Sequence, residues 1–121
     1  MLNVTMKMVA LAIMVLAVPS MSMSHAFPDH SIPRVGETVS TPPVGVYIWF
    51  DGDLEPAFSK ITVKDANGQT IDNGNGRVNP SNEVLLEVGL PKLPPGTYKV
   101  LWSVVSRDGH RTSGDYSFTI K

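Results

Sequence analysis

The 121-residue sequence contains no cysteine, and its six methionines all lie at or before Met23. The lack of cysteine excludes disulfides, thiolate nucleophiles, iron–sulfur clusters and thiolate zinc sites. After Met23, a metal ion has only His, Asp and Glu side chains, the backbone and a free amino terminus as ligands. The stability of the fold must therefore come from side-chain packing.

The sequence has no excess of charge of either sign. Ten Lys and Arg residues oppose eleven Asp and Glu residues, which gives a formal net charge of −1. This balance provides neither the basic stripe of a nucleic-acid-binding protein nor a polybasic patch for anionic lipid. We therefore expect no nucleic-acid partner.

Long hydrophobic runs are also missing. The apolar run Met8–Val18 has 11 residues, whereas a transmembrane helix needs about 20. Such a run, followed by Pro19 and several small residues, is typical of a secretory signal peptide. The S-H-A sequence at 24–26 favours cleavage after Ala26, which gives a signal peptide at 1–26 and one domain at 27–121. Cleavage after Ser24 and an uncleaved anchor are the alternatives.

The rest of the chain has the period-two alternation of β-strands. Apolar and polar residues alternate in five segments, at 44–50, 61–64, 84–90, 98–105 and 116–120. Turn-forming Gly, Pro and Asn residues separate them, and the Asn-rich stretch 72–82 is predicted to be a loop. A single helical turn is possible at 53–58. Several short strands with regular turns predict an all-β, two-sheet sandwich.

Only three histidines are available as metal ligands: His25, His30 and His110. Asp108 and His110 are two residues apart, so in an extended segment both side chains point to one face, where they could share a cation. A D-G-H sequence is also an ordinary turn. Ser106 and Ser113 lie near His110, but no G-x-S-x-G motif surrounds them, and this argues against a hydrolase.

Three segments carry a resemblance to a known family. They are SHAFPDHSIPRVGETV, GVYIWFDGDLEPAFSKITVKDANGQTI and LPPGTYKVLWSVVSRDGHRTSGDYSFTI. The most specific pattern is P-P-G-T-Y-x-V-x-W-x-V-V-S-x-D-G-H-x-x-x-G, from Pro94 to Gly114. Together they resemble the CopC/PcoC family of periplasmic copper-resistance proteins over essentially the whole of 27–121. The resemblance implies a Greek-key β-sandwich or barrel of the immunoglobulin-like, cupredoxin-like kind.

The resemblance also implies a Cu(II) site formed by an N-terminal histidine, with its free amine, and a D-x-H near the last strand. Asp108 and His110 match the D-x-H. Phe27 stands where the family has its first histidine, so His30 is the expected third ligand. Cleavage after Ser24 would instead make His25 the first residue and a ligand. The family's methionine-rich Cu(I) site is not expected here, because the domain has no methionine.

Three functions are compatible with these residues. The resemblance favours a periplasmic protein that sequesters or carries Cu(II), with a CopD-like inner-membrane copper transporter as its partner and no enzymatic activity. A copper mono-oxygenase with a histidine brace and a metal-free immunoglobulin-like interaction module are the alternatives. Zn(II) accepts the same ligands in a tetrahedron, so the residue types alone do not separate it from Cu(II).

Overall fold

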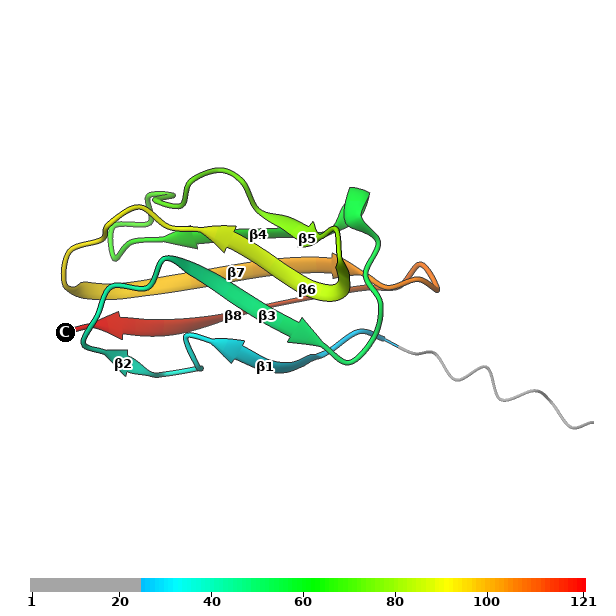
Figure 1. Ribbon diagram of the computed structural model, residues 1–121, viewed down its shortest axis with the longest axis horizontal. Coiled ribbons are helices and arrows are strands. Elements are labelled where there is room, and N and C mark those ends of the chain that lie inside the picture. The colour runs from blue at the N-terminus through cyan, green and yellow to red at the C-terminus, as the bar shows by residue number, and fades with distance from the viewer. Residues whose placement is uncertain (1–24) are drawn as a thin grey trace, which may run out of the picture.

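The computed structural model describes residues 25–121 (Figure 1), so the signal peptide expected at 1–26 lies almost entirely outside the described residues. Eight strands and one short 3₁₀ helix make up the domain. In chain order they are β1 (Pro28–Ile32), β2 (Thr38–Val39), β3 (Gly45–Phe50), η1 (Pro56–Phe58), β4 (Lys60–Lys64), β5 (Arg77–Asn79), β6 (Asn82–Gly89), β7 (Gly96–Val105) and β8 (Arg111–Ile120). No helix within 25–121 is long and apolar enough to span a membrane.

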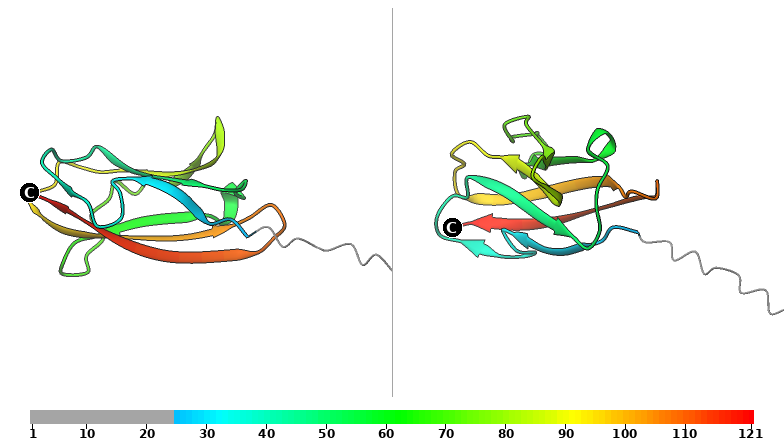
Figure 2. Two further views of the ribbon diagram at one scale, coloured as in Figure 1. Left: turned by 90° about the horizontal axis from the view of Figure 1, so that it is seen from below. Right: turned by 45° about the vertical axis from the view of Figure 1, so that its right-hand side comes forward.

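The strands form two four-stranded sheets that pack face to face, as the edge-on view in Figure 2 shows. One sheet has the order β1-β3-β6-β5 and the other the order β2-β8-β7-β4. All neighbouring strands are antiparallel except β2 and β8, which are parallel. The predicted all-β, two-sheet sandwich is therefore confirmed.

Five of the eight strands follow the predicted alternation, whereas β1, β2 and β5 do not show it in the sequence. These three are edge strands of two to five residues, and pairing with a neighbour forms them despite a weak pattern. β5 lies inside the stretch predicted to be a loop. β8 begins at Arg111, well before the expected strand at 116–120, because its polar first half pairs with β7 up to Val105.

The core lies between the sheets and consists of the alternate, inward-facing side chains of the long strands. Each Val, Ile, Leu or Phe side chain that is fully buried stabilises the fold by roughly 1.5–3 kcal/mol. The buried residues include Val46, Ile48, Phe50, Leu54, Ile61, Val63, Leu86, Val88, Val100, Val104, Phe118 and Ile120. Ala26, at 1% exposed, belongs to the same core.

Trp102 of β7 extends across β8 and packs edge-to-face on Phe50, with ring centroids 5.2 Å apart. Its indole ring lies over Gly114, where a Cβ atom would be 2.6 Å from the ring. A glycine is therefore required at this position of β8. The contact between Trp102 and Phe50 extends the packing between the two sheets towards the end of the sandwich where the β7–β8 turn lies.

Tyr116 is buried on the inner face of β8, and its hydroxyl donates a 2.9 Å hydrogen bond to the carbonyl of Pro33. Burial raises the pKa of Tyr116 to about 12. In the unfolded chain the phenol ionises near its ordinary value of 10.0. The raised pKa therefore stabilises the fold fully below pH 10, and this contribution is lost as the pH rises towards 12.

Alkaline unfolding tests this assignment. We expect Tyr116→Phe to be less stable than wild type at pH 7 by about 1 kcal/mol, because it lacks the hydrogen bond. Between pH 10 and 12 the wild type should lose up to about 1.4 kcal/mol more per pH unit than the variant, because only wild type has this phenol to ionise. Urea denaturation at pH 7, 10 and 11.5 measures both effects, with Tyr47→Phe on the outer face as control. Parallel pH profiles for wild type and Tyr116→Phe would contradict the assignment.

Candidate metal centre

Asp108 and His110 lie in the tight turn between β7 and β8, at the end of the sandwich where the described chain begins (Figure 1). The amide of Ser106 donates a 2.9 Å hydrogen bond to the carbonyl of His110, and the amide of Gly109 donates one of 2.9 Å to the carbonyl of Ser106. Gly109 has a φ of 88°, a left-handed conformation that favours glycine. The D-G-H sequence thus forms the turn, and this turn also presents both candidate ligands.

The carboxylate of Asp108 is held by its own turn. Its Oδ1 accepts hydrogen bonds from the Ser106 hydroxyl and, at 3.1 Å, from the His110 amide. These bonds, with that of Ser106 the stronger, lower the pKa of Asp108 to about 2. The side chain is 30% exposed and carries a full negative charge at neutral pH, as a metal ligand must.

The imidazole of His110 lies beside this carboxylate. Its Nδ1 is 3.1 Å from Oδ2 of Asp108, within ion-pair distance for a protonated ring, but without a hydrogen bond of good geometry. Nδ1 is buried without any hydrogen-bond partner. An unpartnered buried nitrogen costs free energy, unless a bound group satisfies it. Two atoms that bind one ion through bonds of about 2 Å lie roughly 3 Å apart, which matches this pair.

A second set of contacts connects the β7–β8 turn to neighbouring segments at the same end of the sandwich. Arg107 is paired with Glu83 at 2.6 Å and with Glu55 at 3.6 Å, and its amide donates to the carbonyl of Asp53 at 3.2 Å. Leu54, fully buried, forms an isolated bridge with Ser106. The loop after β3 and the start of β6 therefore both contact the turn.

The first described residues cross the same end of the sandwich. The hydroxyl of Thr112, two residues after His110, donates a 2.7 Å hydrogen bond to the carbonyl of Ala26. Phe27 is then paired with Asp51 through two hydrogen bonds, one from its amide to Oδ1 at 2.8 Å and one from the Asp51 amide to its carbonyl at 2.9 Å. These bonds attach the start of the domain to β8 through Thr112 and to the end of β3 through Asp51.

As a consequence, His25 lies directly against His110. The centroids of the two imidazole rings are 5.0 Å apart, and the rings meet at 66°. For metal–nitrogen bonds of about 2 Å, two imidazoles on one ion have centroids between about 4.5 and 6.3 Å apart, depending on the angle at the metal. The spacing of His25 and His110 is within this range, so these residues fit a shared ion.

His30 does not join this group. It lies on β1 opposite Trp49, and its ring is stacked on the indole with centroids 4.5 Å apart. Its Nδ1 is 3.0 Å from a carboxylate oxygen of Asp29, and its side chain is 58% exposed. The structure therefore brings together His25, Asp108 and His110 and places His30 on the outer face of the first sheet.

The three gathered residues do not yet form a closed site. Within residues 25–121, no three His, Asp or Glu side chains already have the arrangement of a complete metal site. The assembled part is the Asp108–His110 pair, with His25 adjacent. A closed site requires a change in the position of the His25 ring and a further donor that is not one of these side chains.

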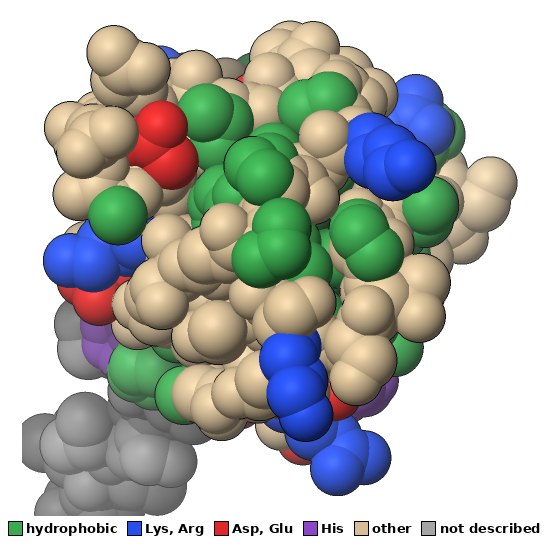
Figure 3. Space-filling view, turned by 90° about the vertical axis from the view of Figure 1, so that its left-hand side faces the viewer, with side chains coloured by type: hydrophobic (Ala, Val, Ile, Leu, Met, Phe, Trp, Pro, Cys, Tyr) green, Lys and Arg blue, Asp and Glu red, His purple; other side chains and the backbone are tan. Residues whose placement is uncertain are grey.

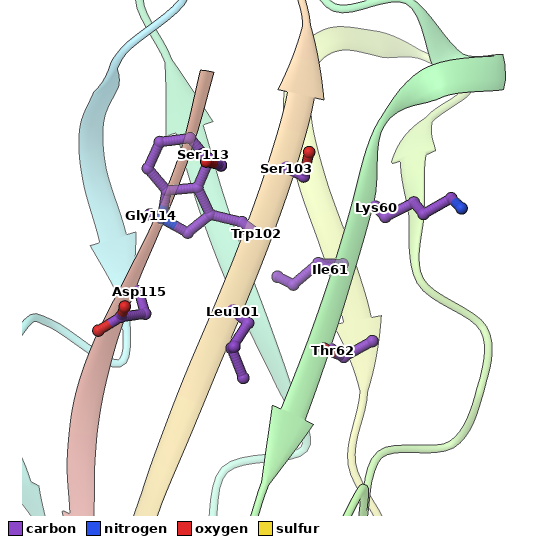
Figure 4. A pocket seen from close by; sticks show the side chains of 9 residues that line it. All are labelled: Lys60, Ile61, Thr62, Leu101, Trp102, Ser103, Ser113, Gly114 and Asp115. Atoms are coloured by element: carbon purple, nitrogen blue, oxygen red, sulfur yellow. The ribbon is translucent and has the colours of Figure 1, made fainter. Parts of the chain in front are cut away.

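A surface groove lies on the second sheet, away from the candidate metal centre. It has a volume of about 430 Å³ and runs over the outer face of β4, β7 and β8, as Figure 4 shows. Leu101, Ser103 and Ser113 contribute to its floor, and Lys60 and Asp115 are its charged residues. These two residues do not make a metal site or a nucleophile–base pair. The groove is therefore not a candidate active site.

The opposite end of the domain is more hydrophobic at its surface. Figure 3 looks onto this end and shows hydrophobic side chains gathered between a few Lys and Arg side chains. The segments that line a shallow depression there are 41–44 and 90–92, which include Pro42, Pro43 and Pro91. No His, Asp or Glu lines this depression. The candidate metal centre thus lies at the other end only, as far as residues 25–121 are concerned.

Fold and site together define a small β-sandwich that presents nitrogen and oxygen donors at one end. Residues 29–121 match the CopC domain family, and the chain belongs to this family. It is similar to protein YobA of Escherichia coli K12, with 33% identity over 93% of this chain and 92% of YobA. It is also 31% identical to the copper transport protein CutJ of Bacillus subtilis over 93% of this chain.

The match to CutJ covers only 21% of CutJ, so the chain spans about a fifth of that protein. Among solved structures, the crystal structure of CopC from Methylosinus trichosporium OB3b aligns with a TM-score of 0.71 and 31% identity. The alignment covers 80% of this chain and 94% of that one. The resemblance read from the sequence is thereby confirmed for both family and fold.

Removal of the Thr112 hydroxyl tests the attachment of the first residues. We expect Thr112→Val, which has nearly the same shape, to lower the free energy of unfolding by about 1 kcal/mol, because the Ala26 carbonyl loses its donor. Urea denaturation of the metal-free protein measures this change. Thr119→Val is the control, because the hydroxyl of Thr119 makes only an exposed 3.2 Å contact with the hydroxyl of Thr97. Equal stability of both variants would show that the bond to Ala26 does not anchor the segment.

Proposed function

We propose that this protein is a periplasmic copper-binding protein that holds Cu(II) between His25, Asp108 and His110, and that sequesters or carries the ion. The observation that carries the proposal is the unpartnered, buried Nδ1 of His110. It lies 3.1 Å from the ionised carboxylate of Asp108, and the imidazole of His25 lies against the same ring. Membership of the CopC domain family and the copper transport named for CutJ support the same conclusion.

The donor set favours copper in its divalent state. The gathered side chains offer two imidazoles and a carboxylate, and residues 25–121 contain neither Met nor Cys. Nitrogen and oxygen ligands suit Cu(II), which is also the strongest binder among the first-row divalent ions, whereas Cu(I) prefers sulfur. When bound, the ion would be the cargo of the protein.

Residue 25 supplies the missing donors if it is the first residue of the mature chain. Its amine and imidazole then chelate together, and the N-terminal histidine implied by the family is present two positions before Phe27. Ala26 supports this choice, because it is packed in the core and its carbonyl is bonded to Thr112. Cleavage after Ala26 would remove both His25 and this contact. We therefore place the cleavage after Ser24, where Ser22 and Ser24 also satisfy the small-x-small pattern.

The position of the site suits a carrier better than an enzyme. Asp108 and His110 are 30% and 40% exposed, at the narrow end of the sandwich, where a partner can reach the ion directly. A mono-oxygenase with a histidine brace needs a broad face for its substrate around the metal. Two grooves of about 430 Å³ each lie instead on the second sheet, and neither is lined by the candidate ligands. A CopD-like membrane transporter is the partner that we propose.

The mature N-terminus is the first test. We expect the protein, produced with its full N-terminal sequence in a Gram-negative host and collected from the periplasm, to begin at His25. Intact-mass spectrometry, followed by sequencing of the N-terminal peptide, distinguishes this start from Phe27, because the two masses differ by one His and one Ala. A mature chain that begins at Phe27 would remove His25 from the site.

Ligand variants of the protein that begins at His25 form the second test. We expect His110→Ala and His25→Ala to weaken Cu(II) binding by at least about tenfold each, because each removes a ligand outright. His30→Ala is the matched control and should change the affinity by less than about twofold. Competition against a chelator of known affinity measures all three. Loss of affinity in His30→Ala alone would reverse the assignment.

A further inference from the structure

Ser106 is the last residue before the turn that carries the candidate ligands. Its side chain is almost completely buried, at 3% exposed. The hydroxyl donates to Oδ1 of Asp108 and lies 3.2 Å from the carbonyl oxygen of His110. A buried hydroxyl costs free energy unless it is hydrogen-bonded, so this position would favour an apolar residue if packing alone decided it.

The hydroxyl determines which oxygen of Asp108 remains free. A carboxylate oxygen accepts about two hydrogen bonds, and Oδ1 already accepts one from Ser106 and one from the His110 amide. Within residues 25–121, Oδ2 accepts no hydrogen bond of good geometry and lies 3.1 Å from Nδ1 of His110. A metal ion that binds both residues is therefore directed to Oδ2, as a ligand through one oxygen.

The turn itself does not depend on this hydroxyl. Its backbone is closed by the bonds from the Ser106 amide to His110 and from the Gly109 amide to Ser106, and the His110 amide also bonds to Asp108. Arg107 anchors the turn independently through Glu83 and Glu55. What the hydroxyl adds is a second hydrogen bond that fixes the rotation of the Asp108 carboxylate.

We propose that Ser106 is a positioning residue of the metal centre, which holds Asp108 so that Oδ2 alone points at the ion beside His110. This inference rests on the proposed function. Without the hydroxyl, the carboxylate can rotate about its χ2 angle and present either oxygen. The ion then binds a group that must first be ordered, and the copper complex becomes both weaker and different in geometry. Loss of such an orienting partner typically costs 10- to 100-fold in metal affinity.

The experiment compares Ser106→Ala with Ser59→Ala in the protein that begins at His25. Ser59 is a matched control: it is 6% exposed, and its hydroxyl donates to the carbonyl of Glu55 and accepts from the amide of Val105, but it does not touch Asp108. We expect Ser106→Ala to lower the Cu(II) affinity by about 10- to 100-fold and to alter the electron paramagnetic resonance spectrum of the complex. Ser59→Ala should lose comparable thermal stability with an unchanged spectrum and affinity.

A double-mutant cycle shows whether Ser106 acts through Asp108. In an Asp108→Ala background, Ser106→Ala should change the affinity by less than about twofold. A loss of the same size in both backgrounds would overturn the proposal. Ser106→Thr retains a hydroxyl and should retain the wild-type spectrum. A folded threonine variant with the altered spectrum would contradict the proposal even if the alanine variant does not fold.

The outcomes also separate this inference from the proposed function. If the wild type binds no Cu(II), or if Asp108→Ala binds as tightly as wild type, the metal centre itself is wrong. If the wild type binds, Asp108→Ala is weakened and Ser106→Ala behaves as wild type, the centre stands and only the role of Ser106 is refuted.

Discussion

The hydrogen bond from Thr112 to the carbonyl of Ala26 joins two segments that are more than eighty residues apart in the sequence. It is the contact that places His25 against His110, because His25 directly precedes the residue whose carbonyl is anchored. Burial of the Ala26 side chain reinforces it. The candidate site therefore depends on how firmly the first residues of the domain are attached to β8.

The other half of the site is ordered before any ligand arrives. Asp108 and His110 lie in a turn whose backbone bonds, glycine and ion pairs to Glu55 and Glu83 fix its shape. Such preorganisation lowers the entropic cost of binding, because few torsions remain to be fixed. The first residues have no comparable framework beyond Ala26 and Phe27. We therefore regard the turn as the rigid half of the centre and His25 as its adjustable half.

Much of the fold follows from the sequence pattern. The alternation in β3, β4, β6 and β7 predicts both the strands and their buried faces, since period-two patterns encode which side chains face the core. The short edge strands β1, β2 and β5 escape prediction because pairing with a neighbour, and not their own composition, creates them.

The candidate site, like the fold, can be predicted from the sequence only in part. Asp108 and His110 are predictable because both are in one local turn, and the motif that carries the family resemblance includes them. The choice between His25 and His30 cannot be predicted from the sequence. It depends on two contacts between distant segments, of Ala26 with Thr112 and of His30 with Trp49. The small side chain of Ala26 suits both the residue before a cleavage site and a buried position in the core, so the sequence does not distinguish these two roles. Ser106 belongs to the family motif, yet only the structure shows that its hydroxyl bonds to Asp108.

The most direct measurement is an anomalous difference map, at the copper absorption edge, from crystals of the mature protein loaded with Cu(II). Our account predicts one strong peak at the end of the sandwich, within bonding distance of His25, Asp108 and His110. A peak beside His30 and Trp49, with none at the β7–β8 turn, would contradict it.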